Sequence, residues 1–160
     1  MENKSILKTI KIHPSKLTSK LKNHIMDVLK ETYENKCILN IGYIIEVLKI
    51  ENIQSSFISR ANSEIILNVK FNINYIEPKV DAVLQVKVCH VIEEHGILCR
   101  INNIRIIVAK NTLVDFNFNR KSNSFIKQQT SIKLDDQIKV QIKGVKFSND
   151  IYNCFASLVL

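Results

Sequence analysis

The sequence is poor in the residues that build phosphate loops, redox motifs and metal clusters: its 160 residues include no tryptophan, three glycines, two prolines and four cysteines. The glycines stand apart, so no G-x-G-x-x-G or G-K-[ST] loop is present to bind a nucleotide. The cysteines have no C-x-x-C spacing, which predicts reduced thiols in an intracellular protein. No apolar run approaches the roughly 20 residues of a membrane-spanning helix, and the N-terminus lacks the basic-then-apolar pattern of a secretion signal.

The histidines and carboxylates do not form a recognisable catalytic or metal-binding pattern. No cysteine or carboxylate lies at metal-ligand spacing, such as H-E-x-x-H, from His13, His24, His90 or His95. Asp135 and Asp136 are adjacent, but neighbouring residues of a strand point to opposite faces, so this pair predicts a turn. We therefore expect no metal, no cofactor, no small-molecule substrate and no catalytic residues in this chain.

Positive charge is the strongest compositional bias of the chain. Lysine and arginine total 23 against 15 aspartate and glutamate residues, which gives a net charge of +8 and a pI near 9.4. This balance favours contact with nucleic acid or with an acidic protein surface. With 46% hydrophobic residues, the chain can bury one core, or two modest cores of about 80 residues each.

The first half predicts one helix lying on an antiparallel sheet. An alternating strand ends at His13-Pro14, and a helix follows with Ser15 as its cap and its end near Asn35. Apolar residues recur at three- and four-residue steps along that helix, at Leu17, Leu21, Ile25, Val28 and Leu29. The remaining segments are a strand over 37–50, a polar loop over 51–63 and a long alternating strand over 64–75.

Pro78 marks the predicted boundary between two domains. Proline has a fixed φ and no N–H for a strand ladder, so it separates the long strand from the apolar run that begins at Ala82. We predict an α+β domain over 1–80 and a second domain over 81–160. The second has three short strands before an irregular connection over 110–136 and two after it, which predicts an all-β, five-stranded barrel of the oligonucleotide-binding (OB) type.

The second domain is the candidate nucleic-acid-binding part. Its predicted nucleic-acid-binding residues are Lys87, Arg100, Arg105, Lys139, Lys143 and Lys146. Each of them taken singly also fits an ordinary solvated surface. The aromatic residues considered for base stacking are Phe116, Phe118, Phe125 and Tyr152. Because the second and third barrel strands lack aromatics and Glu93-Glu94 makes the first loop negative, we expect weak, nonspecific and salt-sensitive contact with RNA.

The first domain offers a candidate surface for a protein partner. Partner binding is predicted for Asn35, Lys36, Ile53, Phe57, Ile58 and Arg60. Phe57 and Ile58 are unusually apolar for a loop, and exposed apolar groups often mark interfaces. The alternative is a loop folded back on its own core.

Three stretches resemble the stalk subunit of multisubunit RNA polymerases, the family that includes the archaeal E-prime subunit and the eukaryotic seventh subunit of polymerase II. They are residues 10–14 before the helix, 37–47 in the next strand, and 71–78 running into 81–83. In the last stretch Phe71, Tyr75 and Pro78 match the family's crossing between domains, whereas Val80-Asp81 stands where the family has Gly-Glu. The compact length is also similar to the small stalk-like polymerase subunits of poxviruses and other large cytoplasmic DNA viruses.

The resemblance implies a noncatalytic subunit of a DNA-dependent RNA polymerase. Its N-terminal tip domain would dock on the large core subunits and its basic OB barrel would lie near the nascent RNA. Two alternatives stay open: a free-standing OB-type protein that binds single-stranded RNA, and a scaffold or inhibitor that uses the barrel for protein contact. The implied location is the nucleus for a cellular polymerase, or the cytoplasm of an infected cell and the virion for a viral one.

Overall fold

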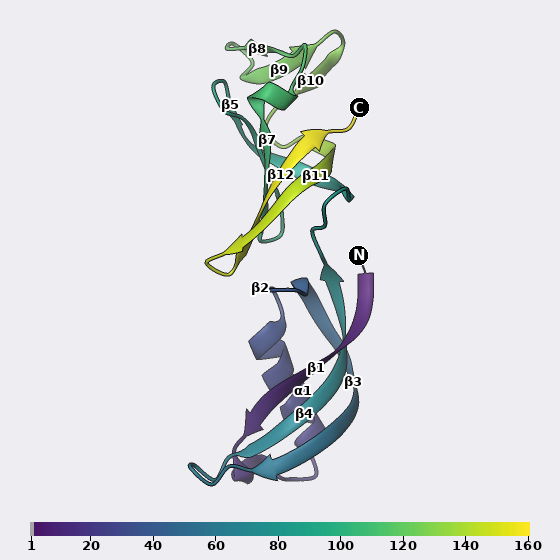
Figure 1. Cartoon of the computed structure of the whole chain (residues 1–160), viewed down its shortest axis with the longest axis vertical. Helices are drawn as coiled ribbons and strands as arrows, with labels where there is room; N and C mark the ends of the chain where they lie inside the picture. Colours follow the sequence, from purple (N-terminus) through teal and green to yellow (C-terminus); the bar gives the residue numbers. More distant parts are fainter. Residues whose placement is uncertain (1) are drawn as a thin grey trace. The chain divides into compact units, whose positions relative to one another are not determined.

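The computed structural model describes residues 2–160, and the chain divides into two compact units, Met1–Ile76 and Glu77–Leu160. Figure 1 shows that the N-terminal residues form a helix-on-sheet unit and the C-terminal residues form an all-β unit. The predicted fold class, an α+β unit followed by a five-stranded OB-type barrel, is confirmed.

The first unit is a four-stranded antiparallel sheet, in the order β1-β4-β3-β2, with one α-helix packed against it. Its elements are β1 (Glu2–Ile12), α1 (Leu21–Tyr33), β2 (Lys36–Ile38), β3 (Gly42–Ile58) and β4 (Ile65–Ile76). Ile25 and Leu29 of the helix are fully buried against Phe71 and its neighbours on β4. This apolar layer between helix and sheet is the core of the unit.

Strand β4 is the long alternating strand that the sequence predicts. Its odd-numbered residues are buried, and its even-numbered residues are half-buried on the opposite face. On that second face Asn68 accepts a hydrogen bond from the Thr9 hydroxyl at 2.6 Å, and Asn72 accepts one from the Ser5 hydroxyl at 2.5 Å. These polar bonds between β4 and β1 add to the backbone ladder that fixes their register.

Helix α1 begins later than the sequence indicates. Pro14–Lys16 forms a 3₁₀ turn in which the His13 ring Nδ1 accepts the Ser15 N–H at 3.2 Å, so the predicted Ser15 cap of α1 is wrong. Because the helix starts only at Leu21, Leu17 is left 55% exposed. Of the predicted stripe, Leu21, Ile25, Val28 and Leu29 pack on the sheet, and Met26 and Tyr33 of the helix join them.

The predicted single strand over 37–50 is wrong, because the chain turns at 39–41 between β2 and β3. Asn40 and Gly42 take positive φ values of 65° and 124° at this turn. Leu39, which lies in this turn, is 56% exposed. Apolar residues keep strand spacing through the turn, so alternation alone did not reveal it.

The predicted loop over 51–63 is also wrong, because β3 continues to Ile58 and pairs with β4 throughout. Four register shifts along this pairing each insert one extra residue into β3. Core-facing positions of β3 therefore recur every three residues, at Ile44, Val47, Ile50, Ile53 and Ser56. Such bulges bend and twist a strand, and β3 is visibly curved in Figure 1.

The second unit contains a closed barrel of five strands in the order β11-β12-β7-β6-β5. The strands are β5 (Val83–Ile92), β6 (Gly96–Ile101), β7 (Ile104–Ala109), β11 (Gln137–Ser148) and β12 (Ile151–Leu158). β12 pairs with β7 in parallel and every other pair is antiparallel. Side chains such as Val88, Ile106, Val140 and Cys154 fill the interior and have no exposed surface.

The connection over 110–136, expected to be irregular, folds into a small antiparallel sheet in the order β10-β9-β8. Its strands are β8 (Asn117–Asn119), β9 (Ser124–Lys127) and β10 (Thr130–Ile132). Phe118 packs edge to face on the buried Phe125, with 5.2 Å between ring centroids. These two aromatic rings therefore belong to a local core.

A bulge in β5 changes which of its residues face the barrel interior. The pairing with β6 shifts between Val88 and His90. As a result Val86, Val88 and then Val91 are buried, whereas His90 is exposed. Beyond the bulge the alternation of buried and exposed residues is therefore shifted by one position.

Candidate partner and nucleic-acid surfaces

An apolar groove lies in the first unit between the end of β3 and the start of α1. Its volume is about 660 Å³, and its lining residues are Leu17, Leu21, Ile53, Ser56, Phe57, Ile58, Ile65 and Leu67. Because α1 begins at Leu21, the core-facing side of β3 is not covered at Ile53 and Ile58, which are 38% and 69% exposed. The structure thus brings three predicted partner residues together, on a strand edge instead of a loop.

The other three predicted partner residues are not gathered in this groove. Asn35 lies at the opposite end of β3, where its N–H donates to the Ile44 carbonyl at 2.8 Å and its side chain accepts from the Tyr43 hydroxyl at 3.1 Å. Lys36 lies beside it and donates to a backbone carbonyl of α1 at 2.9 Å. Arg60 is exposed in the turn that follows β3.

Several predicted nucleic-acid-binding residues form one row across the outer surface of the barrel. Lys87 on β5 lies opposite Arg100 on β6, and Arg100 lies opposite Arg105 on β7. The row continues through Asn153 on β12 to Lys146 on β11. The four charged side chains are exposed. We call these five residues the basic row.

Lys139 and Lys143, also predicted to bind nucleic acid, lie on β11 outside the basic row. Lys139 lies opposite Gln85 of β5, and Lys143 occupies the β11 bulge, where its Nζ donates to Gln141 Oε1 at 3.0 Å. Both side chains are exposed. They extend the positive surface but are not in register with the two arginines.

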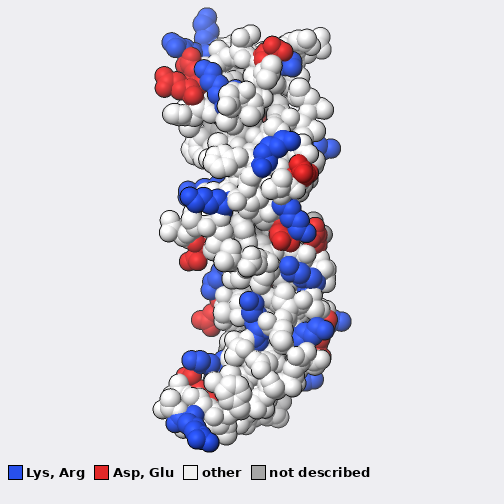
Figure 2. Space-filling model, viewed as in Figure 1, with Lys and Arg blue, Asp and Glu red and all other residues white. Residues whose placement is uncertain are grey.

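Acidic side chains neutralise part of the basic surface. Lys87 Nζ lies 3.5 Å from Asp135 Oδ1, and Arg120 Nε lies 3.0 Å from Glu93 Oε2. Arg100 and Arg105, by contrast, have no ion pair within residues 2–160. On the face shown in Figure 2, basic and acidic side chains are interspersed over each unit. Within residues 2–160 the unpaired positive charge of the basic row therefore lies at its two arginines and at Lys146 on β11.

The aromatic residues considered for base stacking lie elsewhere than on the outer face of the barrel. Tyr152 faces the barrel interior and Phe125 the core of the small sheet, at 5% and 1% exposure. Phe118 packs on Phe125, and Phe116 is half-buried with Lys127 Nζ 5.8 Å from its ring centroid. None of these four rings offers a free face in register with the basic row.

The barrel carries a different exposed aromatic, Phe155, which is 54% exposed on β12. Sequence reasoning missed it because the last strand was not assigned an inward and an outward face. Alternation supplies the signal: Tyr152, Cys154 and Ala156 are buried, so the residue between the last two must point outward.

The described residues offer few reactive groups. Among residues 2–160, no three histidine, cysteine or acidic side chains come together in an arrangement that could hold a metal ion. The four cysteines are free, and burial, with a smaller effect from Cys89, raises the pKa of the Cys99 thiol to about 12. No helix in this part of the chain is long and apolar enough to cross a membrane.

Comparison with known proteins agrees with this architecture. Residues 8–64 match the model described as the SHS2 domain found in the N terminus of Rpb7p/Rpc25p/MJ0397. The chain is also 27% identical, over 146 residues, to DNA-directed RNA polymerase II subunit RPB7 of Saccharomyces cerevisiae, covering 88% of this chain and 85% of that protein. With the helix-on-sheet unit and the barrel, these matches confirm that the chain resembles the Rpb7-type family of RNA polymerase stalk subunits.

Proposed function

We propose that this chain is a noncatalytic stalk subunit of a DNA-dependent RNA polymerase, and that its first unit docks on the large core subunits. The observation that carries the docking proposal is the apolar groove at the end of β3, with Phe57 and Ile58 at 56% and 69% exposure. Exposed apolar side chains grouped in a cleft are typical of protein interfaces. The similarity to RPB7 supplies the kind of partner.

The barrel is proposed to contact the emerging RNA weakly and without sequence preference. Strands two and three of an OB barrel form the usual face for oligonucleotides, and here those strands are β6 and β7. They carry Arg100 and Arg105, which, like Lys146 of the same row, have no ion pair within residues 2–160. Contacts from such residues to phosphates release counterions, so the affinity falls as salt rises. The subunit would be found wherever its polymerase is located.

Affinity purification of the tagged full-length chain from its native source tests this proposal. Large polymerase subunits should be recovered in stoichiometric amounts. Recovery of RNA with no polymerase subunit would instead support a free-standing RNA-binding protein. Recovery of another protein that is released when the barrel surface is altered, and not when the groove is altered, would support a scaffold or inhibitor.

A further inference from the structure

Phe155 lies in a second row of outward-facing residues that crosses the same five strands as the basic row. Across the barrel this row consists of His90, Leu98, Ile107, Phe155 and Gly144. On β7 and β12 it is displaced from the basic row by two residues, which corresponds to about 7 Å along a strand. The aromatic ring therefore lies beside Arg105 and Lys146 and on the same side of the sheet.

The neighbours of Phe155 leave its ring accessible. On one side lies Gly144, where an added Cβ would come within 3.7 Å of a Phe155 ring carbon, so the missing side chain leaves that edge of the ring uncovered. On the other side lies Ile107, which is 36% exposed. At 54% exposure Phe155 is the most exposed of the large apolar side chains in its row.

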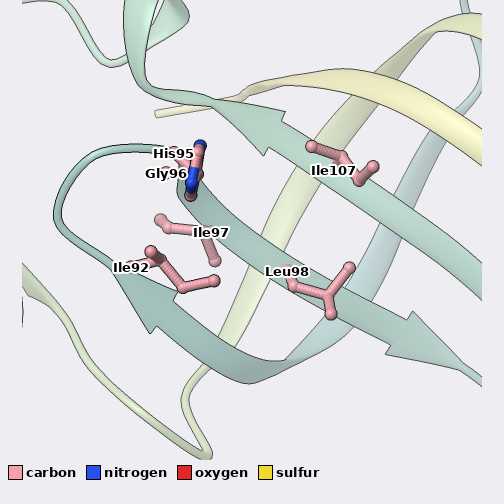
Figure 3. A pocket seen from close by; sticks show the side chains of 6 residues that line it. All are labelled: Ile92, His95, Gly96, Ile97, Leu98 and Ile107. Carbon is pink, nitrogen blue, oxygen red and sulfur yellow. The ribbon is translucent and has the colours of Figure 1, made fainter.

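An apolar hollow continues the row toward the end of the barrel. It has a volume of about 170 Å³ and is lined by Ile92, His95, Gly96, Ile97, Leu98 and Ile107. Figure 3 shows these residues on the adjoining strands β5, β6 and β7 and on the turn before Gly96. Leu98 and Ile107 belong to both the hollow and the row. Together with Phe155 they form an apolar band across β6, β7 and β12, with Phe155 at its β12 end and positive charge along one border.

We infer that Phe155 is a stacking site for an unpaired base of single-stranded RNA whose phosphates lie along the basic row. This inference rests on the RNA contact proposed above. Phe155 would be the residue that favours single-stranded RNA over a duplex. Arg100 and Arg105 face each other and have no ion pair within the described part of the chain, an arrangement that favours binding of a polyanion. Proteins bind single-stranded nucleic acid by placing exposed aromatic side chains beside positively charged residues. The bases stack on the aromatic rings, and every base has a face that can stack. In a duplex those faces are covered by neighbouring bases.

The test compares a short fluorescein-labelled oligouridylate with an RNA hairpin of the same length, by fluorescence anisotropy on the full-length chain. Phe155→Ala should weaken binding of the single strand about tenfold, within the range of one stacked base, and leave hairpin binding unchanged. Its slope of log affinity against log salt should stay as in the wild type, because no cation is removed. Phe155→Tyr should bind as the wild type does, and Phe155→Leu, which retains bulk without a ring, should bind as weakly as Phe155→Ala. Leu134→Ala, which removes a similarly exposed apolar side chain of the second unit outside both rows, is the matched control and should bind both RNAs as the wild type does.

The outcomes separate this inference from the proposal on which it rests. If the wild-type chain binds neither RNA, the proposed RNA contact fails and the stacking site fails with it. If Arg100→Gln weakens binding but Phe155→Ala and Phe155→Leu bind like the wild type, the RNA contact stands and the stacking site is wrong. If those two variants keep full RNA affinity but lose a copurifying protein, the apolar band is a protein interface and the inference is overturned. Far-UV circular dichroism of each variant verifies that the barrel remains folded.

Discussion

Arg100 of β6 and Arg105 of β7 lie directly opposite each other on the outer surface of the barrel, and neither has an ion pair within residues 2–160. Like charges at this cross-strand spacing destabilise a sheet. Lys87, the next residue of the row, lies opposite Arg100 and adds to the repulsion, although Asp135 offsets part of its charge. The barrel therefore holds a concentration of positive charge that a bound polyanion would relieve.

The arginine pair predicts that stability and RNA affinity change in opposite directions. Arg105→Gln should raise the free energy of unfolding by about 0.2–1 kcal/mol, because it removes a like-charge contact. The same substitution should weaken RNA binding and reduce the salt slope by about 0.7, the value for one phosphate contact on a single strand. Urea unfolding and anisotropy titrations at several salt concentrations measure the two effects.

Lys121→Gln is the matched control for that prediction, since Lys121 is exposed in the turn after β8 and lies outside the basic row. It removes the same charge and should change neither quantity. Equal effects from the two substitutions would mean that net charge, and not the register of the row, determines RNA binding.

Gly96 is a position where glycine is required. Its φ is +116°, and a Cβ would lie 2.2 Å from the Val108 carbonyl oxygen and 2.7 Å from the Lys110 nitrogen. Both obstacles are backbone atoms, so Gly96→Ala should destabilise the barrel by roughly 2–5 kcal/mol through strain and overpacking. Gly144→Ala, where a Cβ meets a ring carbon at 3.7 Å, should change stability by less than about 1 kcal/mol. Chemical unfolding followed by circular dichroism compares the two, and equal losses would show that the close approach at Gly96 is not rigid.

The buried Cys99 thiol predicts that the free energy of unfolding decreases at alkaline pH. In the native state the pKa of Cys99 is raised to about 12, mainly by burial, from a reference value of 9.0. Between these values the unfolded thiol loses its proton and the native thiol keeps it, so the stability contributed by Cys99 is present below about pH 9 and is lost as pH rises toward 12. The difference in unfolding free energy between the wild type and Cys99→Val should accordingly decrease across this range.

Thiol labelling provides a second measurement of the same prediction. Near neutral pH, native Cys89 is half-buried and should react first with a thiol reagent, whereas Cys99 has no exposed surface and should react only after unfolding. Labelling of both thiols at the same rate in the folded protein would contradict the burial of Cys99.

Strict alternation was predictable, and irregular strand pairing was not. β4 alternates without interruption, so its core face could be assigned from sequence alone. β3 has four bulges, and its core-facing residues recur every three positions, a spacing that matches neither a strand nor a helix. The segment over 51–63 consequently resembled a loop, although its apolar residues Ile53, Phe57 and Ile58 correctly indicated an exposed apolar surface.

For the candidate sites too, the residue types could be predicted from the sequence, but their arrangement could not. The basic residues could be chosen from charge and approximate strand position, but which of them share a row depends on register between strands that are distant in sequence. Tyr152 and Phe155 differ only in the phase of β12, and that phase decides which ring faces solvent. The start of α1 could not be predicted, because the hydrogen bond from the Ser15 N–H to the His13 ring forms a separate 3₁₀ turn. The spacing of apolar residues along the sequence gives no sign of that turn.

Quantitative mass spectrometry of polymerase purified from its native source tests the docking account most directly. The chain carrying both Phe57→Asp and Ile58→Asp should be bound to polymerase about tenfold less than the wild type or more weakly still, because charge would enter the apolar groove. Leu39→Asp alters a residue of the same first unit, as exposed as Phe57, but at the other end of β3, and it should stay bound. Docking through the groove would be contradicted if the double variant were recovered with polymerase as fully as the wild type. It would also be contradicted if Leu39→Asp reduced recovery as much as the double variant does.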